Sequence, residues 1–350
     1  MVLTLHSGHI SILSSFLYLI IFAEKLETMK QGLLLLLLSF YFNLHAQLGG
    51  ELDITYGTDG VAEYTITING ELRGVTIFDS HQLPDGKLLA VGTAQSGCSN
   101  YRVFYGVILR LNPDGSLDTS FQDGGYGFYG DTGFRQIKPM GAGSFLVANS
   151  DRLRKIDVDG NMDMTFGVDG AIMTEMSVTS VALHPDGAFI LGGSTTNSAG
   201  KYELTVSKVL ADGSVDTDFA TDGYFKIPFQ ELASHTLYEL QLDASNRILI
   251  NGRKQRTQNN GNVLLVRLTP QGNPDTSFAD NGVYVDLHHY NGVADKVVIE
   301  DNGNLLIAGH GLETAFGDLG MILSRLNGNG VIDTTFGTEG RAYHPIYSDS

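Results

Sequence analysis

Short apolar runs alternate with polar turn residues along most of the chain after residue 50. Residues 178–183 alternate like a half-buried strand, and residues 189–193 form a continuous apolar run, typical of a strand buried on both faces. Residues 204–209 form another β-compatible run, and a short one at 171–174 precedes all three. We name these predicted strands A, B, C and D in chain order, beginning with 171–174. Short strands separated by turn signals predict an all-β fold.

One phrase recurs six times and divides the chain into repeats. Its clearest copy reads NPDGSLDTSF at 112–121, and its aspartate returns at intervals of 45 to 65 residues. Four strands in each such repeat predict a β-propeller of four-stranded antiparallel blades. Five B–C hairpins and five D strands favour five blades, whereas six A strands leave six blades open. The aspartate and the aromatic residue three positions later are Asp53 and Tyr56, Asp118 and Phe121, Asp163 and Phe166, Asp216 and Phe219, Asp275 and Phe278, and Asp333 and Phe336.

The recurring phrase has a structural explanation. Proline and glycine, as in Pro113 and Gly115, favour a tight turn closed by a glycine bulge. The later aspartate is expected to accept hydrogen bonds from the following amides, as a helix cap does. We expect the aromatic residue to fill the seam between neighbouring blades.

The phrase LNPDGSLDTSF, the hairpin PDGKLLAVG and their spacing resemble the delta-60 repeat family. These are bacterial repeat proteins regarded as β-propellers without an assigned function. The resemblance covers residues 50–340, and it implies neither catalytic residues nor a cofactor. The second repeat departs from it, because it spans 45 residues and has Gly141-Ala142-Gly143-Ser144 in place of the usual turn.

The antiparallel strand order separates two edges of each predicted blade. The regular B–C and D–A turns share one edge, and the irregular A–B and C–D loops share the other. Binding residues usually lie on variable loops held by a rigid scaffold. We therefore expect a protein or polysaccharide partner to bind at the irregular edge.

The N-terminal region predicts export. Lys30, a short leucine-rich run and the small residue Ala46 form the pattern of a secretory signal peptide over residues 29–46. Residues 47–350 would then be a single propeller domain, and residues 1–28 an artefact of the assigned gene start. A longer anchor that is never cleaved is the alternative. Cys98 is the single cysteine, which excludes an intrachain disulfide.

Composition narrows the choice of partners. The formal net charge of −17 argues against nucleic acid and anionic membranes. The predicted mature chain has no integral membrane segment, and we expect a monomer that is secreted or held at the cell surface, with the periplasm as the alternative.

Several side chains are candidates for binding a ligand or a metal ion, although turn and loop roles explain most of them. The basic run around residue 253 would suit an acidic glycan, and the histidines a transition metal. Oxygen side chains at alternate positions resemble a Ca²⁺ loop, but the glycine is misplaced for an EF-hand. The ligand candidates are Arg253, Lys254, Arg256, His288, His289, Tyr290 and His310, and the metal candidates are Asp157, Asp159, Asn161 and Asp163.

A polysaccharide-active enzyme, of the glycoside hydrolase or lyase type, is the alternative function. It would need carboxylates converging in the central funnel. Glu63, Glu175 and Asp286 lie on or near the A strands, which we expect to be innermost, but at different offsets from the motif glycine. A binding scaffold is therefore the favoured hypothesis.

Overall fold

The computed structural model describes residues 53–64, 66–68, 71–72, 74–96, 103–130, 133–198, 200, 202–227, 235–257, 260–312 and 317–346. The chain divides into two compact units, residues 1–61 and 62–350. The described part of the first unit contains a turn in which the Tyr56 amide donates to the Asp53 carbonyl, and a bridge between Thr58 and Val61. No helix long and apolar enough to cross a membrane occurs among the described residues. The predicted signal peptide and Cys98 lie outside them.

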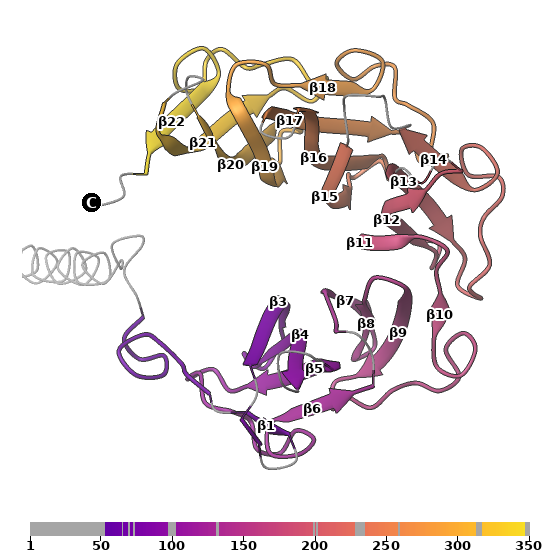
Figure 1. Cartoon of the computed structure of the whole chain (residues 1–350), viewed down its shortest axis with the longest axis vertical. Helices are drawn as coiled ribbons and strands as arrows, with labels where there is room; N and C mark the ends of the chain where they lie inside the picture. The colour runs from indigo at the N-terminus through magenta and orange to yellow at the C-terminus, as the bar shows by residue number, and fades with distance from the viewer. Residues whose placement is uncertain are drawn as a thin grey trace, which may run out of the picture. The chain divides into compact units, whose positions relative to one another are not determined.

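In its described part, the second unit contains five four-stranded antiparallel sheets that follow one another along the chain (Figure 1). A short hairpin of β1 (Thr67–Ile68) and β2 (Glu71–Leu72) comes before them. We number the sheets as blades one to five. Blade one contains β3 (Gly74–Gln82), β4 (Leu88–Ser96), β5 (Val103–Leu111) and β6 (Tyr126–Tyr129), and blade two contains β7 (Gln136–Gly141), β8 (Ser144–Ala148), β9 (Arg152–Asp157) and β10 (Ile172–Met173). Blade three contains β11 (Ser177–Leu183), β12 (Phe189–Thr196), β13 (Tyr202–Val209) and β14 (Tyr224–Ile227); blade four contains β15 (His235–Leu242), β16 (Ile248–Thr257), β17 (Asn260–Leu268) and β18 (Val283–Val285); and blade five contains β19 (Tyr290–Ile299), β20 (Leu305–Leu312), β21 (Leu319–Leu326) and β22 (Arg341–Pro345).

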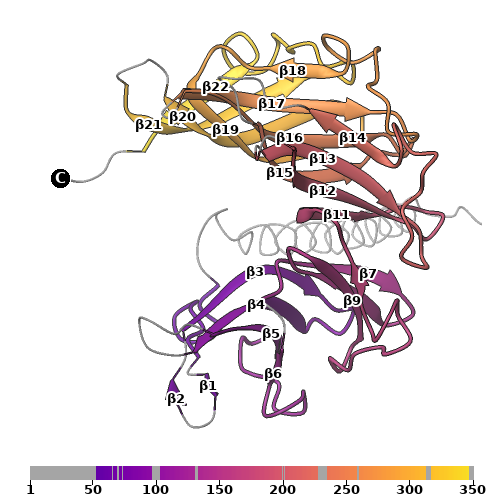
Figure 2. The ribbon, with the colours of Figure 1, turned by 45° about the vertical axis from the view of Figure 1, so that its right-hand side comes forward.

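The first strand of each blade packs beside the first strand of the next, as Figure 1 and Figure 2 show. We call β3, β7, β11, β15 and β19 the inner strands. Four apolar clusters, each shared by two successive blades, fill the seams; Phe121, Phe219 and Phe278 belong to three of them. This arrangement confirms the predicted all-β fold of five four-stranded blades.

The prediction that the A strands are innermost is wrong. The strand that follows each of the last five aspartate motifs is the outermost strand of the blade before it; β14, for example, pairs with β13 and not with β11. The same rule accounts for the sixth predicted A strand, β22, which pairs with β21 as the fourth strand of blade five. The local pattern identified the strands but not their hydrogen-bonding partners.

Blade two shows why its hairpin departs from the repeat. Gly141 pairs with Ser144 across a two-residue loop, in which Ala142 and Gly143 have φ angles of 50° and 72°. Two positive φ angles define the turn whose twist matches a tight hairpin. The shortened loop thus closes the same pair of strands with fewer residues.

Four inner strands carry a β-bulge at an equivalent position, so that one residue in each has no partner on the neighbouring strand. The bulge residues are Phe78, Thr179, Tyr238 and Asp295. The residue before each bulge pairs with a glycine of the next strand, and a Cβ at that glycine would lie 1.8–2.0 Å from a carbonyl oxygen of the inner strand. These glycines are Gly92, Gly193, Gly252 and Gly309.

The close approach at these glycines can be tested with Gly252→Ala. The new Cβ would lie 2.0 Å from the Thr236 carbonyl oxygen, so the bulge must shift. We expect a loss of about 1–3 kcal/mol in the free energy of unfolding, as for an overpacked core, measured by urea denaturation followed by circular dichroism. Gly74→Ala is the control, because no atom lies within 4 Å of its Cβ. Equal losses in both variants would contradict the proposed backbone clash.

Candidate functional site

The blades present two different edges. The regular edge contains the turns between the first and second strands and between the third and fourth strands of each blade. The irregular edge contains the links between the second and third strands and the links from one blade to the next. This division follows from the antiparallel order of the strands. It is unchanged when each predicted A strand is assigned to the preceding blade.

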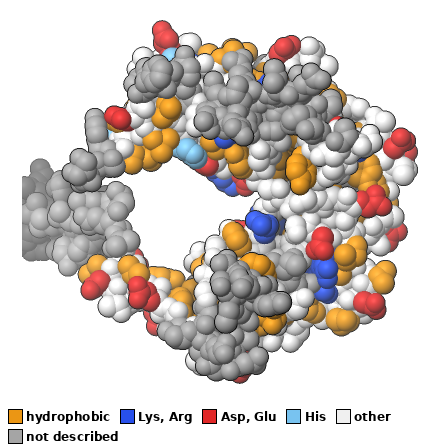
Figure 3. Space-filling view, viewed as in Figure 1, with side chains coloured by type: hydrophobic (Ala, Val, Ile, Leu, Met, Phe, Trp, Pro, Cys, Tyr) orange, Lys and Arg blue, Asp and Glu red, His pale blue; other side chains and the backbone are white. Residues whose placement is uncertain are grey.

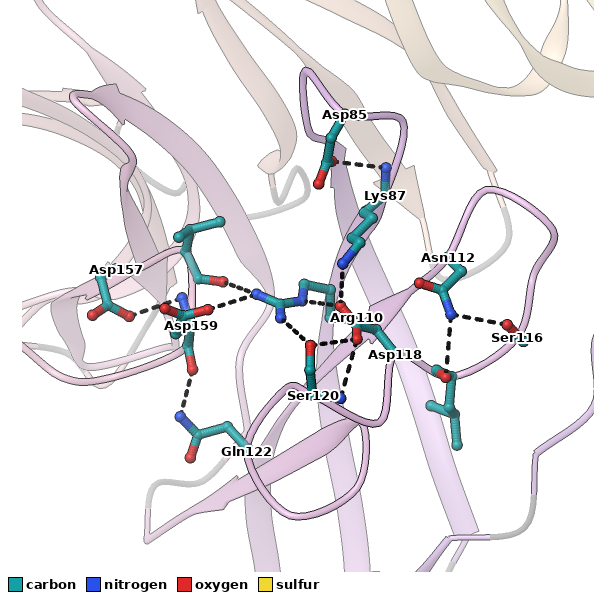
Figure 4. Close-up of polar contacts among 12 residues, drawn as sticks. Asp85, Lys87, Arg110, Asn112, Ser116, Asp118, Ser120, Gln122, Asp157 and Asp159 are labelled. Atoms are coloured by element: carbon teal, nitrogen blue, oxygen red, sulfur yellow. Dashed lines mark hydrogen bonds and ion pairs between the residues drawn. The ribbon is translucent and has the colours of Figure 1, made fainter.

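Charged side chains on the regular edge are bound to one another. Arg110 of β5 donates from Nε to Asp118 Oδ2 over 2.7 Å, and from Nη1 to the Val158 carbonyl and to Asp159 of the next blade (Figure 4). Lys87 adds a second ion pair to Asp118 at 2.7 Å. Hydrogen bonds from Lys87 and then Ser120 hold the pKa of Asp118 well below its usual range. This network joins blades one and two.

The basic residue of this network recurs eight positions before the motif aspartate, a feature that the sequence reasoning missed. The guanidinium of Arg267 lies 2.8 Å from Asp275 and 4.5 Å from the centre of the Phe278 ring. The repeated basic residue on each third strand was the available signal. The pairs are Arg110 with Asp118, Lys155 with Asp163, Lys208 with Asp216, Arg267 with Asp275, and Arg325 with Asp333.

Three motif phenylalanines contact the following blade. A Cβ at Gly160, Gly272 or Gly330, each in a turn of the next blade, would lie 2.6–2.7 Å from the ring of Phe121, Phe219 or Phe278. These three contacts agree with the predicted seam-filling role of the motif aromatic residue.

The predicted Ca²⁺ string is occupied by contacts within the protein. Asp157 Oδ1 accepts the amides of Asp159 and Asn161 at 2.9 and 2.8 Å, and the Asn161 amide group donates to Asp157 Oδ2. Asp159 pairs with Arg110, and Asp163 pairs with Lys155 at 2.9 Å. The described residues contain no group of three or more His, Cys, Asp or Glu side chains arranged to hold a metal ion. Turn hydrogen bonds and two ion pairs within the protein thus engage all four side chains.

The carboxylates proposed for catalysis do not share a site. Glu175 lies between β10 and β11, where it accepts a 3.2 Å hydrogen bond from the Tyr224 hydroxyl beside a cavity of about 260 Å³. Asp286 follows β18 in another seam, and Glu63 is exposed and precedes β1. They were expected beside the innermost strands because the A strands were predicted to be innermost, whereas these strands are outermost.

Asp286 instead belongs to a buried ion-pair group. Its carboxylate lies 3.2 Å from Arg341 Nη2 and 3.3 Å from His289 Nδ1. Burial disfavours the charged form of Asp286, but hydrogen bonds from His289 and the His288 amide, together with the charge of Arg341, outweigh it and lower its pKa to about 2. Because Asp286 follows blade four and Arg341 belongs to blade five, this group fastens two blades together.

Two of the bulge residues lie in a polar group near the irregular edge. Asp295 Oδ2 is 2.7 Å from His310 Nδ1, and Arg253 of β16 donates to Asn291 Oδ1. Burial raises the pKa of Tyr238, while the charge of Arg253 acts to lower it and that of Asp295 to raise it. We call Tyr238, Arg253, Asn291, Asp295 and His310 the Arg253 cluster. On the face seen in Figure 3, basic, acidic and histidine side chains lie near one another where the blades border the central opening.

The predicted ligand residues separate into two groups. Arg253 and His310 belong to the Arg253 cluster, and the backbone of Lys254 pairs with that of His235. His289 is buried against Asp286, and the ring of His288 lies 4.9 Å from that of His289. His310 therefore contacts a different carboxylate from His289. The side chains of Arg256 and Tyr290 lie outside the described set.

The repeats match a family model described as "Domain of unknown function (DUF5122) beta-propeller" over residues 83–121, 184–219, 244–278 and 300–336. Each match begins near a first hairpin and ends at or next to a motif aromatic residue, and the short second blade is not matched. This is a β-propeller repeat protein. No curated protein sequence matches the chain.

Three solved structures resemble the propeller at low sequence identity. They are the extracellular domain of a hybrid two-component system of B. thetaiotaomicron (12% identity, TM-score 0.35), a protein of unknown function from Dyadobacter fermentans (12%, 0.34), and PorZ, a surface component of the type-IX secretion system of Porphyromonas gingivalis (9%, 0.35). The alignments cover 80%, 74% and 75% of this chain. They cover 31%, 65% and 42% of the respective structures, less than two thirds of each.

Proposed function

We propose that this propeller, built from repeats of the delta-60 type, is an exported binding scaffold that takes a protein or polysaccharide partner on its irregular edge. The predicted signal peptide is the basis for export. The contrast between the two edges supports a binding role. On the regular edge, arginine and lysine side chains form ion pairs with the motif aspartates of their own blades.

The irregular edge carries the observation on which the proposal depends. Phe104, Tyr202 and Leu319, close to or at the starts of three third strands, expose 46%, 69% and 48% of their surface. Phe78, a bulge residue, is 47% exposed and lies 5.2 Å from the guanidinium of Arg135. Exposed aromatic rings beside polar groups suit a sugar ring or the apolar part of a protein surface.

The proposal predicts that binding is lost when the irregular edge is changed. A triple variant, Phe104→Ser, Tyr202→Ser and Leu319→Ser, should bind its partner at least tenfold more weakly than the wild type. Glycan binding is measured on an array of neutral and acidic polysaccharides. A protein partner is identified by cross-linking on the surface of the producing cells.

A matched variant on the regular edge provides the control. Met164→Ser, Val168→Ser and Val331→Ser remove three exposed apolar residues from the motif turns and should leave binding unchanged. If the control variant loses binding and the first variant retains it, the partner binds at the regular edge and the proposal is wrong. Absence of any glycan or protein partner would remove the proposal.

A further inference from the structure

Arg253 differs from the arginines that join the blades. Arg110 and Arg267 each lie within 3 Å of a motif aspartate. Arg253 is half-buried, yet no carboxylate of the described residues forms an ion pair with it. Its guanidinium contacts the neutral side chains of Asn291 and Tyr238, and its Nε atom is buried without a hydrogen-bond partner. A guanidinium held in this way retains its capacity to bind an anion.

The fold makes specific room for this side chain. A Cβ at Gly261, the glycine of β17 paired with the residue two positions after Arg253, would lie 2.2 Å from Arg253 Nε. The contact with Asn291 reaches from blade four to blade five. The position of the guanidinium is thus fixed by two blades rather than by a flexible surface loop.

Arg253 begins a short basic run, RKQR, in a chain whose net charge is −17. Lys254 is the next residue, and it pairs through the backbone with His235, whose ring Nδ1 is buried without a partner. Burial first, and then the charge of Lys254, lower the pKa of His235. The nearby carboxylate, Asp295, is engaged by His310 at 2.7 Å.

We propose that Arg253 binds a carboxylate of an acidic polysaccharide. The guanidinium would bind the carboxylate through paired hydrogen bonds, and the Tyr238 ring and the Asp295–His310 pair would contact the neighbouring sugar hydroxyls. A uronic acid places hydroxyls beside each carboxylate, and these can donate to Asp295. An acidic peptide would place further carboxylates against Asp295, which would repel them. This inference deepens the proposed function and depends on it.

The test compares ligands that differ only in charge. Calorimetric titration would use a panel of galacturonate, guluronate and glucuronate oligosaccharides, each beside its neutral methyl ester. Wild-type protein should bind at least one acid form at least tenfold more tightly than the ester. Arg253→Gln should abolish that preference, and Arg253→Lys should restore part of it, because lysine keeps the charge but not the planar fork.

The controls distinguish a failure of the Arg253 site from a failure of the proposed scaffold function. Arg247→Gln removes an arginine from the regular edge, where it pairs with Asp243 at 2.6 Å, and should leave the preference for the acid form intact. Thermal unfolding of each variant verifies that it is folded, and the comparison of acid with ester in the wild type needs no variant. Equal binding of acid and ester, an unchanged preference in Arg253→Gln, or tighter binding of hexaglutamate than of any uronate would overturn the assignment. If glycans bind without preference for the carboxylate, the scaffold function stands and the Arg253 site does not.

Discussion

Phe278→Ala is expected to lower the free energy of unfolding by about 3–5 kcal/mol, the usual cost of removing a buried phenylalanine. Phe278 is fully buried, packs under the Arg267 guanidinium, and contacts the Gly330 turn of the next blade. Its removal leaves a cavity in the seam between blades four and five. The chain has no tryptophan, so urea denaturation is best followed by far-ultraviolet circular dichroism.

Phe336→Ala is the matched control for this substitution. Phe336 occupies the same place in the sixth motif, with Arg325 at 4.9 Å above its ring, but it is only half-buried. We expect less than half the loss seen for Phe278→Ala. Equal losses would mean that the motif phenylalanine stabilises its own blade and that the contact with the next blade contributes little.

Arg341→Leu is expected to lower the free energy of unfolding by about 3 kcal/mol at pH 7, because it leaves the buried carboxylate of Asp286 without its cationic partner. Asp286 is 2% exposed, and the His289 ring and the His288 amide are the other hydrogen-bond partners of its carboxylate among the described residues. The same urea titration at neutral pH provides the measurement.

The pH dependence identifies Asp286 as the cause of that loss. The pKa of Asp286 is lowered to about 2 in the folded protein, below its usual value near 3.9. The stabilisation that Asp286 provides is therefore present above pH 4 and is lost as the pH falls toward 2. The difference in stability between wild type and Arg341→Leu should shrink between pH 7 and pH 3. A constant difference, or one that persists in an Asp286→Asn background, would contradict this account.

The sequence predicted the parts of the fold that local chemistry determines. Turn residues such as Pro113 and Gly115 mark hairpins, and alternation marks strands, so the five blades and their two edges could be predicted. The partner of a short strand could not, because β10 has only two residues and either neighbouring blade would accept its pattern. The placement of Glu175 and Asp286 failed for that reason.

The candidate site was predicted only in part. Arg253 and His310 were found because the repeats differ in sequence there and irregular loops were expected. The structure places these residues in strands β16 and β20. Tyr238 and Asp295 were missed, since a β-bulge is a property of strand pairing and leaves no turn signal in its own strand. The sequence signal of each bulge lies on the neighbouring strand, in Gly252 and Gly309, which pair with the residue before the bulge.

The pairing of each bulge with a glycine has a consequence for engineering new specificity. The glycine and the carbonyl that it accommodates hold the backbone, so the side chain of the bulge residue is free of any pairing requirement. Phenylalanine, threonine, tyrosine and aspartate already occupy this position at residues 78, 179, 238 and 295. A combinatorial library restricted to those four codons would therefore alter the chemistry of the proposed binding surface while leaving the backbone that carries it unchanged.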